Sequence, residues 1–120
     1  MTRSNIHITL SNGTSIVCVA ESSSAPEQGY IVEELFLPLL SLEDSEKELA
    51  LLKQHCTMNE RRANATYRYT IDLTQKSIRM FEEHYNYRKG IFQRGEDVTQ
   101  RYNNYLNGLN TDKWDFDNRT

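Results

Sequence analysis

The chain has 120 residues, of which 38% are hydrophobic and 26% charged, with two cysteines and a formal net charge of −3. This length fits one domain, and a domain of this size buries enough surface to fold without disulfides or metals. Two cysteines exclude a disulfide-dense scaffold, and no apolar stretch approaches the ~20 residues of a membrane-spanning helix. The N-terminus has no apolar core of a secretory signal, so we expect a cytoplasmic protein with reduced thiols and no membrane partner.

The first predicted element is a β-hairpin over residues 5–20. Apolar and polar residues alternate before and after Asn12-Gly13, the pair preferred in two-residue type I′ turns. Pairing outward from such a turn places Ile8 opposite Val17 and puts all the apolar residues on one face. These inward-facing residues are Ile6, Ile8, Leu10, Val17 and Val19.

Residues 21–29 are predicted to be a loop from their composition. The secondary structure of the next segment is ambiguous, whereas that of the segment after it is well indicated. Residues 30–40 form an apolar run that is compatible with a strand or with a short helix ending near Pro38. Residues 42–56 are predicted to be a helix, which either Ser41 or Ser45 can cap. Its apolar stripe consists of Leu42, Leu49, Leu52 and Cys56.

The second half of the chain repeats the pattern of strands followed by a helix. Residues 66–82 predict a second hairpin with an even-numbered loop around Thr74-Gln75-Lys76, and residues 83–95 are expected to be a loop that can hold one short strand. A helix is expected to open at Glu96-Asp97 and to end near Gly108. Its stripe consists of Val98, Tyr102, Tyr105, Leu106 and Leu109.

These elements predict a single α+β domain over residues 1–109, in the order ββ-α-ββ-α. We expect an antiparallel sheet built from the two β-hairpins, with the helices covering one face. Residues 110–120 are predicted to be a polar C-terminal tail, disordered unless Trp114 and Phe116 dock on the domain.

The small net charge is the difference between two unlike segments. Residues 21–48 hold eight acids and one base, for a net charge of −7, whereas residues 53–101 hold ten bases and six acids, for a net charge of +4. Two interpretations are open: the two segments attract each other, or each forms a solvated face or an interface.

No motif of metal binding or catalysis is present. The possible ligands are His7, Cys18, His55, Cys56 and His84, and the predicted register makes His7 and Cys18 cross-strand neighbours. However, the chain has none of the paired spacings that are typical of zinc sites. Both cysteines fall on apolar positions, which favours packing over reactivity. We therefore expect no metal, no cofactor and no enzymatic activity.

One segment interleaves aromatic rings with cations and is the predicted binding site. Its residues are Tyr67, Tyr69, Tyr85, Tyr87, Arg88, Lys89, Phe92 and Arg94. Tyrosine and arginine are enriched in protein interfaces, and the same residue types stack on bases and neutralise phosphates.

Three functions follow as hypotheses from this composition. The first is a non-enzymatic protein-interaction module that self-associates, for instance as a homodimer. The second is a small inhibitor or adaptor of a larger host-defence or mobile-element enzyme. The third is a binder of single-stranded nucleic acid or a nucleotide through the segment rich in tyrosine and arginine.

Overall fold

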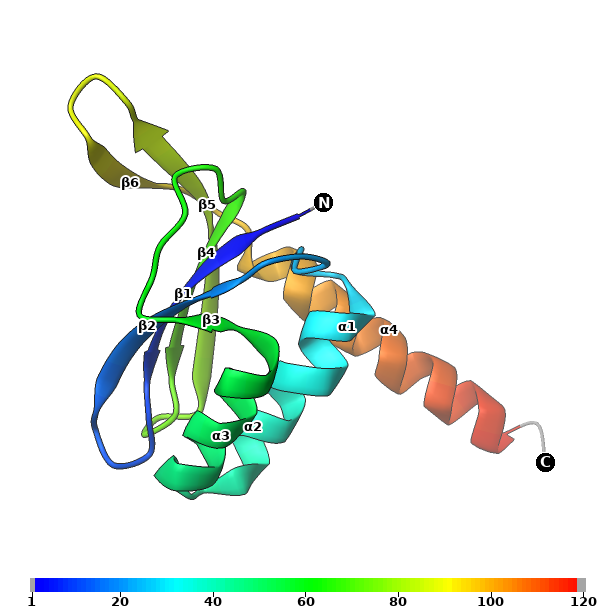
Figure 1. Ribbon diagram of the computed structural model, residues 1–120. Helices are drawn as coiled ribbons and strands as arrows, with labels where there is room; N and C mark the ends of the chain where they lie inside the picture. The colour runs from blue at the N-terminus through cyan, green and yellow to red at the C-terminus, as the bar shows by residue number, and fades with distance from the viewer. Residues whose placement is uncertain (1, 119–120) are drawn as a thin grey trace.

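A computed structural model describes the backbone of residues 2–118 and the side chains through residue 109. Its strands form one six-stranded sheet in the order β3-β2-β1-β4-β5-β6 (Figure 1). The strands are β1 (Ser4–Thr9), β2 (Ser15–Ala20), β3 (Thr57–Met58), β4 (Tyr67–Asp72), β5 (Ser77–Asn86) and β6 (Ile91–Asp97). The α+β class is thus confirmed, but the sheet is mixed and the prediction of a purely antiparallel sheet is wrong, because β1 and β4 are parallel.

The parallel pair arises from the place where the chain re-enters the sheet. The backbone N–H of Thr66 donates to the carbonyl oxygen of Arg3 over 2.9 Å, so β4 starts beside the start of β1. A parallel pair needs a long crossover, and here the connection contains β2, the helical layer and β3. The two predicted hairpins therefore join through β1 and β4, and β1 becomes an interior strand.

The first hairpin has a different register from the predicted one. The N–H of Leu10 donates to the carbonyl oxygen of Thr14 over 2.8 Å, and Gly13 has a φ of 87°. This is a three-residue turn with a glycine bulge, so the loop is one residue longer than in the predicted type I′ turn. Ile8 now pairs with Ile16, not with Val17. A shift of one residue turns the whole of β2 over, and Cys18 enters the core while Val17 faces the other way.

The ambiguous segment 30–40 is helical. It belongs to a continuous run of α1 (Gly29–Ile31), the π-helical η1 (Val32–Phe36) and α2 (Leu37–Leu42). The wide π turn, in which the N–H of Leu37 bonds to the carbonyl of Val32, directly precedes Pro38. Since proline has no N–H to donate, a local widening of the helix lets the chain continue through this residue.

The helix α3 (Ser45–His55) confirms the predicted helix but not its cap. Asp44, rather than Ser41 or Ser45, caps it: its carboxylate accepts bonds from the backbone N–H groups of Glu46 and Lys47, over 2.9 and 3.3 Å. The run of α1, η1 and α2, together with α3, covers one face of the sheet (Figure 1).

The core lies between these helices and the sheet. Tyr69 is fully buried, its ring packs edge-on against Phe36 at 5.5 Å, and its hydroxyl donates to the carbonyl oxygen of Ser24. The carboxylate of Glu48 is also buried and accepts bonds from the backbone N–H and hydroxyl of Ser11, which join α3 to the turn of the first hairpin. The largest apolar side chains of this core are Ile6, Ile8, Ile31, Leu35, Leu39, Leu52, Ile71 and Met80.

The second hairpin is confirmed, but the prediction for the following segment is wrong. Ile71 pairs with Ile78 across a four-residue loop, as an even-numbered loop requires. The segment 83–95 is not a loop, because β5 runs to Asn86 and β6 pairs with it. The strands β5 and β6 extend past the other strands as a projecting arm (Figure 1).

The last helix, α4 (Thr99–Asn118), begins later and ends later than predicted. Tyr102 is buried in the core, whereas the helix passes Gly108 without stopping and projects from the domain (Figure 1). The backbone of residues 110–118 is helical, but the side chains of Trp114 and Phe116, on which the predicted docking depends, lie outside the described residues. Over residues 2–118, no helix has the combination of length and apolar character needed to cross a membrane.

Candidate binding face

The helices cover only one side of the sheet, and the other side is the candidate site. We call it the open face. It is formed by the residues that alternate with the core residues along each strand. The open face includes Asn5, His7, Thr9, Val17, Arg68, Thr70, Arg79, Phe81, Glu83, Phe92, Arg94 and Asp97.

A buried polar network joins β1, β4 and β5 on the open face. The carboxylate of Glu83, whose side chain is 0% exposed, accepts a bond of 2.8 Å from Arg68 and one of 2.9 Å from the amide of Asn5. The same amide group of Asn5 exchanges two bonds with the backbone of Arg62, over 2.7 and 3.1 Å. The network therefore fixes the loop before β4 on the open face and neutralises both Arg68 and Glu83.

His7 lies beside this network, with a nitrogen that has no partner. Its Nε2 atom is buried and has no hydrogen-bond partner among the described residues. Burial is the main cause that lowers the pKa of His7, and the positive charges of Arg61 and Arg68 lower it further, against an opposing effect of Glu83. A neutral imidazole at this position offers a hydrogen bond to a ligand without adding a charge.

Three arginines lie over aromatic rings of the open face: Arg79 and Arg94 from its strands, and Arg61 from the loop before β4, which we count with the open face from here on. The guanidinium of Arg61 is 3.9 Å from the centre of the Phe92 ring, and those of Arg94 and Arg79 are 4.4 and 5.7 Å from the centre of the Phe81 ring. Such contacts attract the guanidinium group to the ring and restrict its motion. The rings thus act as supports, and the guanidinium groups form the outer surface.

Only one of these three arginines has an acidic partner. Arg79 pairs with Asp97 over 2.6 Å, and bonds from Thr99 and then from Arg79 lower the pKa of Asp97 to about 2. Arg61 and Arg94 form no ion pair with any described carboxylate. These two cations are therefore available to an anionic ligand.

The open face is hollowed in two adjoining places. One hollow, of about 610 Å³, is lined by His7, Thr9, Val17, Asn59, Thr70 and Asp72, among others. The second, of about 570 Å³, is lined by Thr70, Arg79, Phe81, Arg94, Gly95 and Asp97. Both linings contain Thr70, so the two hollows adjoin there, and we call them together the groove.

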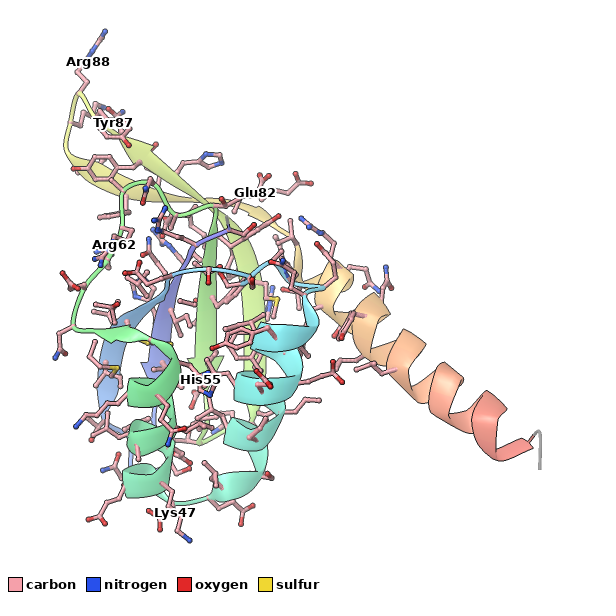
Figure 2. All side chains as sticks on the ribbon, turned by 45° about the vertical axis from the view of Figure 1, so that its right-hand side comes forward. Lys47, His55, Arg62, Glu82, Tyr87 and Arg88 are labelled. Atoms are coloured by element: carbon pink, nitrogen blue, oxygen red, sulfur yellow. The ribbon has the colours of Figure 1, made fainter. Side chains whose placement is uncertain are left out.

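The arm ends in a second cationic surface, which we call the arm tip and define as Tyr87, Arg88 and Lys89. Tyr87 is 74% exposed, although its ring packs edge-on against Tyr85 at 4.8 Å. Arg88 projects from the end of the turn, and Figure 2 places both labelled residues at the end of the molecule opposite Lys47. A backbone bond of 2.7 Å from Gly90 to Asn86 closes the turn, in which Gly90 has a φ of 67°. The aromatic packing and the closed turn hold the arm tip away from the domain.

The predicted binding residues divide into two groups. Tyr67 and Tyr69 are buried beneath the helices, where the hydroxyl of Tyr67 accepts a bond of 2.9 Å from Arg101. They face the core because they alternate with Arg68, which faces the open side. The other six belong to the arm: Tyr85, Tyr87, Arg88, Lys89, Phe92 and Arg94. The prediction did not include His7, Arg79 and Phe81, whose only signal was the alternation along their strands, or Arg61, which lies in the loop before β4.

The predicted contact between His7 and Cys18 is wrong. The residue opposite His7 is Val17, and the side chain of Cys18 lies on the core side of β2. A hydrogen bond with Cys56 is the main cause that raises the pKa of Cys18, and burial raises it further. The thiol therefore stays protonated near neutral pH. Among the described side chains, no group of three or more potential ligands is placed to share a metal ion.

The acidic segment forms part of the helical layer and is only partly neutralised. Ion pairs of 3.0 Å between Arg62 and Glu21 and of 3.1 Å between Lys76 and Glu43 join the acidic segment to the basic one, and Arg101 also pairs with Glu27. Attraction between the two segments is therefore real, but it uses only part of their charge.

Two of the remaining acids line a surface hollow. It is lined by Gly29, Tyr30, Glu33 and Glu34, and we call it the acidic hollow. Glu33 accepts a bond of 2.9 Å from the hydroxyl of Tyr105, and Tyr30 is 41% exposed. Neither Glu33 nor Glu34 forms an ion pair with a described basic side chain.

Comparisons of this chain with protein-family models, with curated proteins and with solved structures found no match.

Proposed function

We propose that the protein is a non-enzymatic interaction module that self-associates, with the arm tip of one copy bound in the acidic hollow of another. The observation that carries this proposal is the pair of exposed, complementary surfaces: unpaired cations at the arm tip, and unpaired carboxylates beside Tyr30 in the acidic hollow. Arginine and tyrosine are the residue types that dominate binding energy at protein interfaces.

The two surfaces cannot easily meet within one copy. The arm projects from the sheet on one side of the molecule, whereas η1, which carries Glu33 and Glu34, lies in the helical layer on the other face (Figure 1). The packing of Tyr85 against Tyr87 and Phe92, at 4.8 and 4.7 Å, keeps the arm in this extended position. A second copy therefore supplies the partner surface.

A contact between two different surfaces has consequences for the assembly. Such a heterologous contact does not close after two copies unless the rotation brings the ends together, so it produces a ring or a growing chain. A hairpin tip in a shallow hollow buries less than the ~1,200 Å² of a stable interface, so each contact is weak. Attraction between exposed charges is screened by salt, which makes the association dependent on ionic strength.

Sedimentation velocity over a range of protein concentrations tests the proposal. We expect the average mass to rise with concentration at low salt and to return to that of one chain at high salt. Two charge-reversed variants, Arg88→Glu with Lys89→Glu and Glu33→Lys with Glu34→Lys, are each expected to remain single chains. An equimolar mixture of the two variants restores association, because the acidic arm of one fits the basic hollow of the other.

A matched control changes two charges elsewhere. Lys47→Glu with Lys53→Glu alters α3, outside both surfaces, and is expected to leave association unchanged. A wild-type chain that stays single at every concentration and at low salt contradicts the proposal. So does a mixture of the two reversed variants that shows no more association than either variant alone.

A further inference from the structure

We propose that the open face binds single-stranded nucleic acid, through a surface separate from the arm tip. The binding residues are the two unpaired arginines Arg61 and Arg94, on their phenylalanine supports, and the groove that Arg94, His7 and Thr9 line. This inference does not depend on self-association.

The fixed guanidinium groups carry the first step of the argument. A guanidinium can stack on a base through its plane and donate to phosphate oxygens through its edges. The guanidinium of Arg61 lies 3.9 Å from the centre of the Phe92 ring and that of Arg94 lies 4.4 Å from the centre of the Phe81 ring, and no described carboxylate competes for either. The acids nearest to them are already used, because Glu83 binds Arg68 and Asp97 binds Arg79.

The groove supplies the hydrogen bonds. Thr9, Asn59 and Thr70 line it with side chains that can donate and accept, as base edges require. His7 adds the buried Nε2 atom that has no partner. The one acid that lines the groove away from the arginines, Asp72, is at the end of β4, where its carboxylate accepts bonds from Thr74. From β2 to β6 the sheet is about 19 Å wide, which gives room for about four nucleotides.

The same features disfavour an acidic peptide as the occupant. Peptides are commonly held by an exposed strand edge or by apolar pockets for anchor side chains. The open face is the flat side of the sheet rather than its edge. Its hollows are lined by hydrogen-bonding side chains of threonine, serine, asparagine, aspartate and arginine together with the apolar Ile8, Ile16, Val17, Ile71 and Phe81. Exposed, unpaired arginines beside hydrogen-bonding side chains match the phosphates and base edges of a nucleic acid.

Fluorescence anisotropy with labelled single-stranded DNA and RNA oligonucleotides tests the inference. We expect Arg61→Ala with Arg94→Ala to weaken binding by tenfold or more and to reduce the salt slope of log K by about 1.4, since two phosphate contacts are lost. The matched control, Lys47→Ala with Lys53→Ala on α3, removes the same charge and is expected to leave binding unchanged.

Two further measurements test whether stacking contributes beyond charge and whether the bound ligand is a nucleic acid. Arg61→Lys with Arg94→Lys keeps both charges but removes the planes, and we expect it to bind more weakly than wild type. Equal binding by this variant overturns the stacking arrangement, and equal binding by the double alanine variant overturns the site. Displacement of the oligonucleotide by polyglutamate at equal charge concentration identifies an acidic protein as the occupant and also overturns the inference.

The arm-tip variant distinguishes this inference from the proposed function. Arg88→Glu with Lys89→Glu is expected to abolish self-association while oligonucleotides still bind through Arg61 and Arg94. Loss of oligonucleotide binding in this variant to the same extent as in the double alanine variant overturns the separation of the two surfaces.

Discussion

The two faces of the sheet come from the same strands but have opposite properties. On β4, Tyr69 is fully buried against the helices, whereas its neighbours Arg68 and Thr70 face the open side. The covered face is apolar and closely packed, so changes there act on folding. The open face carries arginines and hydrogen-bonding side chains and is hollowed, so we expect changes at its exposed positions to act on the proposed binding rather than on folding. One strand would then serve stability and the proposed binding at alternate positions.

The largest expected effect is on the covered face. Tyr69→Ala removes a fully buried ring that packs on Phe36, and we expect it to lower the free energy of unfolding by about 3–5 kcal/mol. Urea denaturation followed by circular dichroism measures this change. Thr70→Ala, one position along β4 on the open face, is the control and is expected to change stability by less than about 0.5 kcal/mol. Similar losses for both variants contradict the contrast between the faces.

A smaller effect is expected where the open face is itself buried. Glu83→Ala leaves the partly exposed Arg68 and the amide of Asn5 without their acceptor, and we expect a loss of about 2–3 kcal/mol, less than for a fully buried pair. Replacing both Arg68 and Glu83 with methionine should recover part of this loss, since no unpaired charge remains. Denaturant midpoints of the single and double variants decide the point; a double variant less stable than Glu83→Ala contradicts it.

A local change in the helical layer gives a milder loss. Asp44→Ala removes the side chain that caps α3, and we expect it to cost about 1 kcal/mol. Asp44→Ser retains a capping oxygen and should restore most of the stability, whereas Ser41→Ala and Ser45→Ala should each have little effect. Thermal melting of the four variants tests the assignment, and a larger loss from either serine variant than from Asp44→Ala refutes it.

The smallest expected effect is a pH dependence from His7. Since burial lowers its pKa in the folded chain, the unfolded chain binds a proton that the folded chain rejects, and stability falls as the pH decreases below the usual value of 6.5. His7→Gln should flatten the dependence of stability on pH between neutral and mildly acidic conditions. Unfolding curves measured across this range provide the test, with His84→Gln, at an exposed position, as the control. An unchanged slope in His7→Gln contradicts the prediction.

Local patterns were sufficient to predict most of the elements but not how they join. Alternation along residues 66–82 predicted the second hairpin, including the even-numbered loop. In contrast, the turn at Asn12-Gly13 is compatible with two loop lengths, and the choice depends on which face of β2 the core needs. The parallel pairing of β1 with β4 involves residues more than sixty positions apart, so no local pattern could indicate it.

The candidate site was predictable only in part, for a similar reason. Composition pointed to the arm, because tyrosine and arginine are concentrated there, and binding by the arm stays a prediction. It also included Tyr67 and Tyr69, since composition alone does not distinguish the two faces of a strand. Arg61 was missed because its position over Phe92 joins a loop to a strand that the sequence did not clearly indicate.

The interior position of β1 also constrains how the chain reaches its fold. Because β1 pairs with both β2 and β4, the sheet cannot form as one unit until the chain beyond residue 66 returns to the N-terminal strand. Each half can form its own hairpin early, but joining them requires closure of a long loop, which is slow because its entropy is lost before the contacts form. During synthesis, one edge of β1 therefore stays unpaired until β4 has been made. An unpaired strand edge can pair with another chain, so this stage is the one most exposed to aggregation.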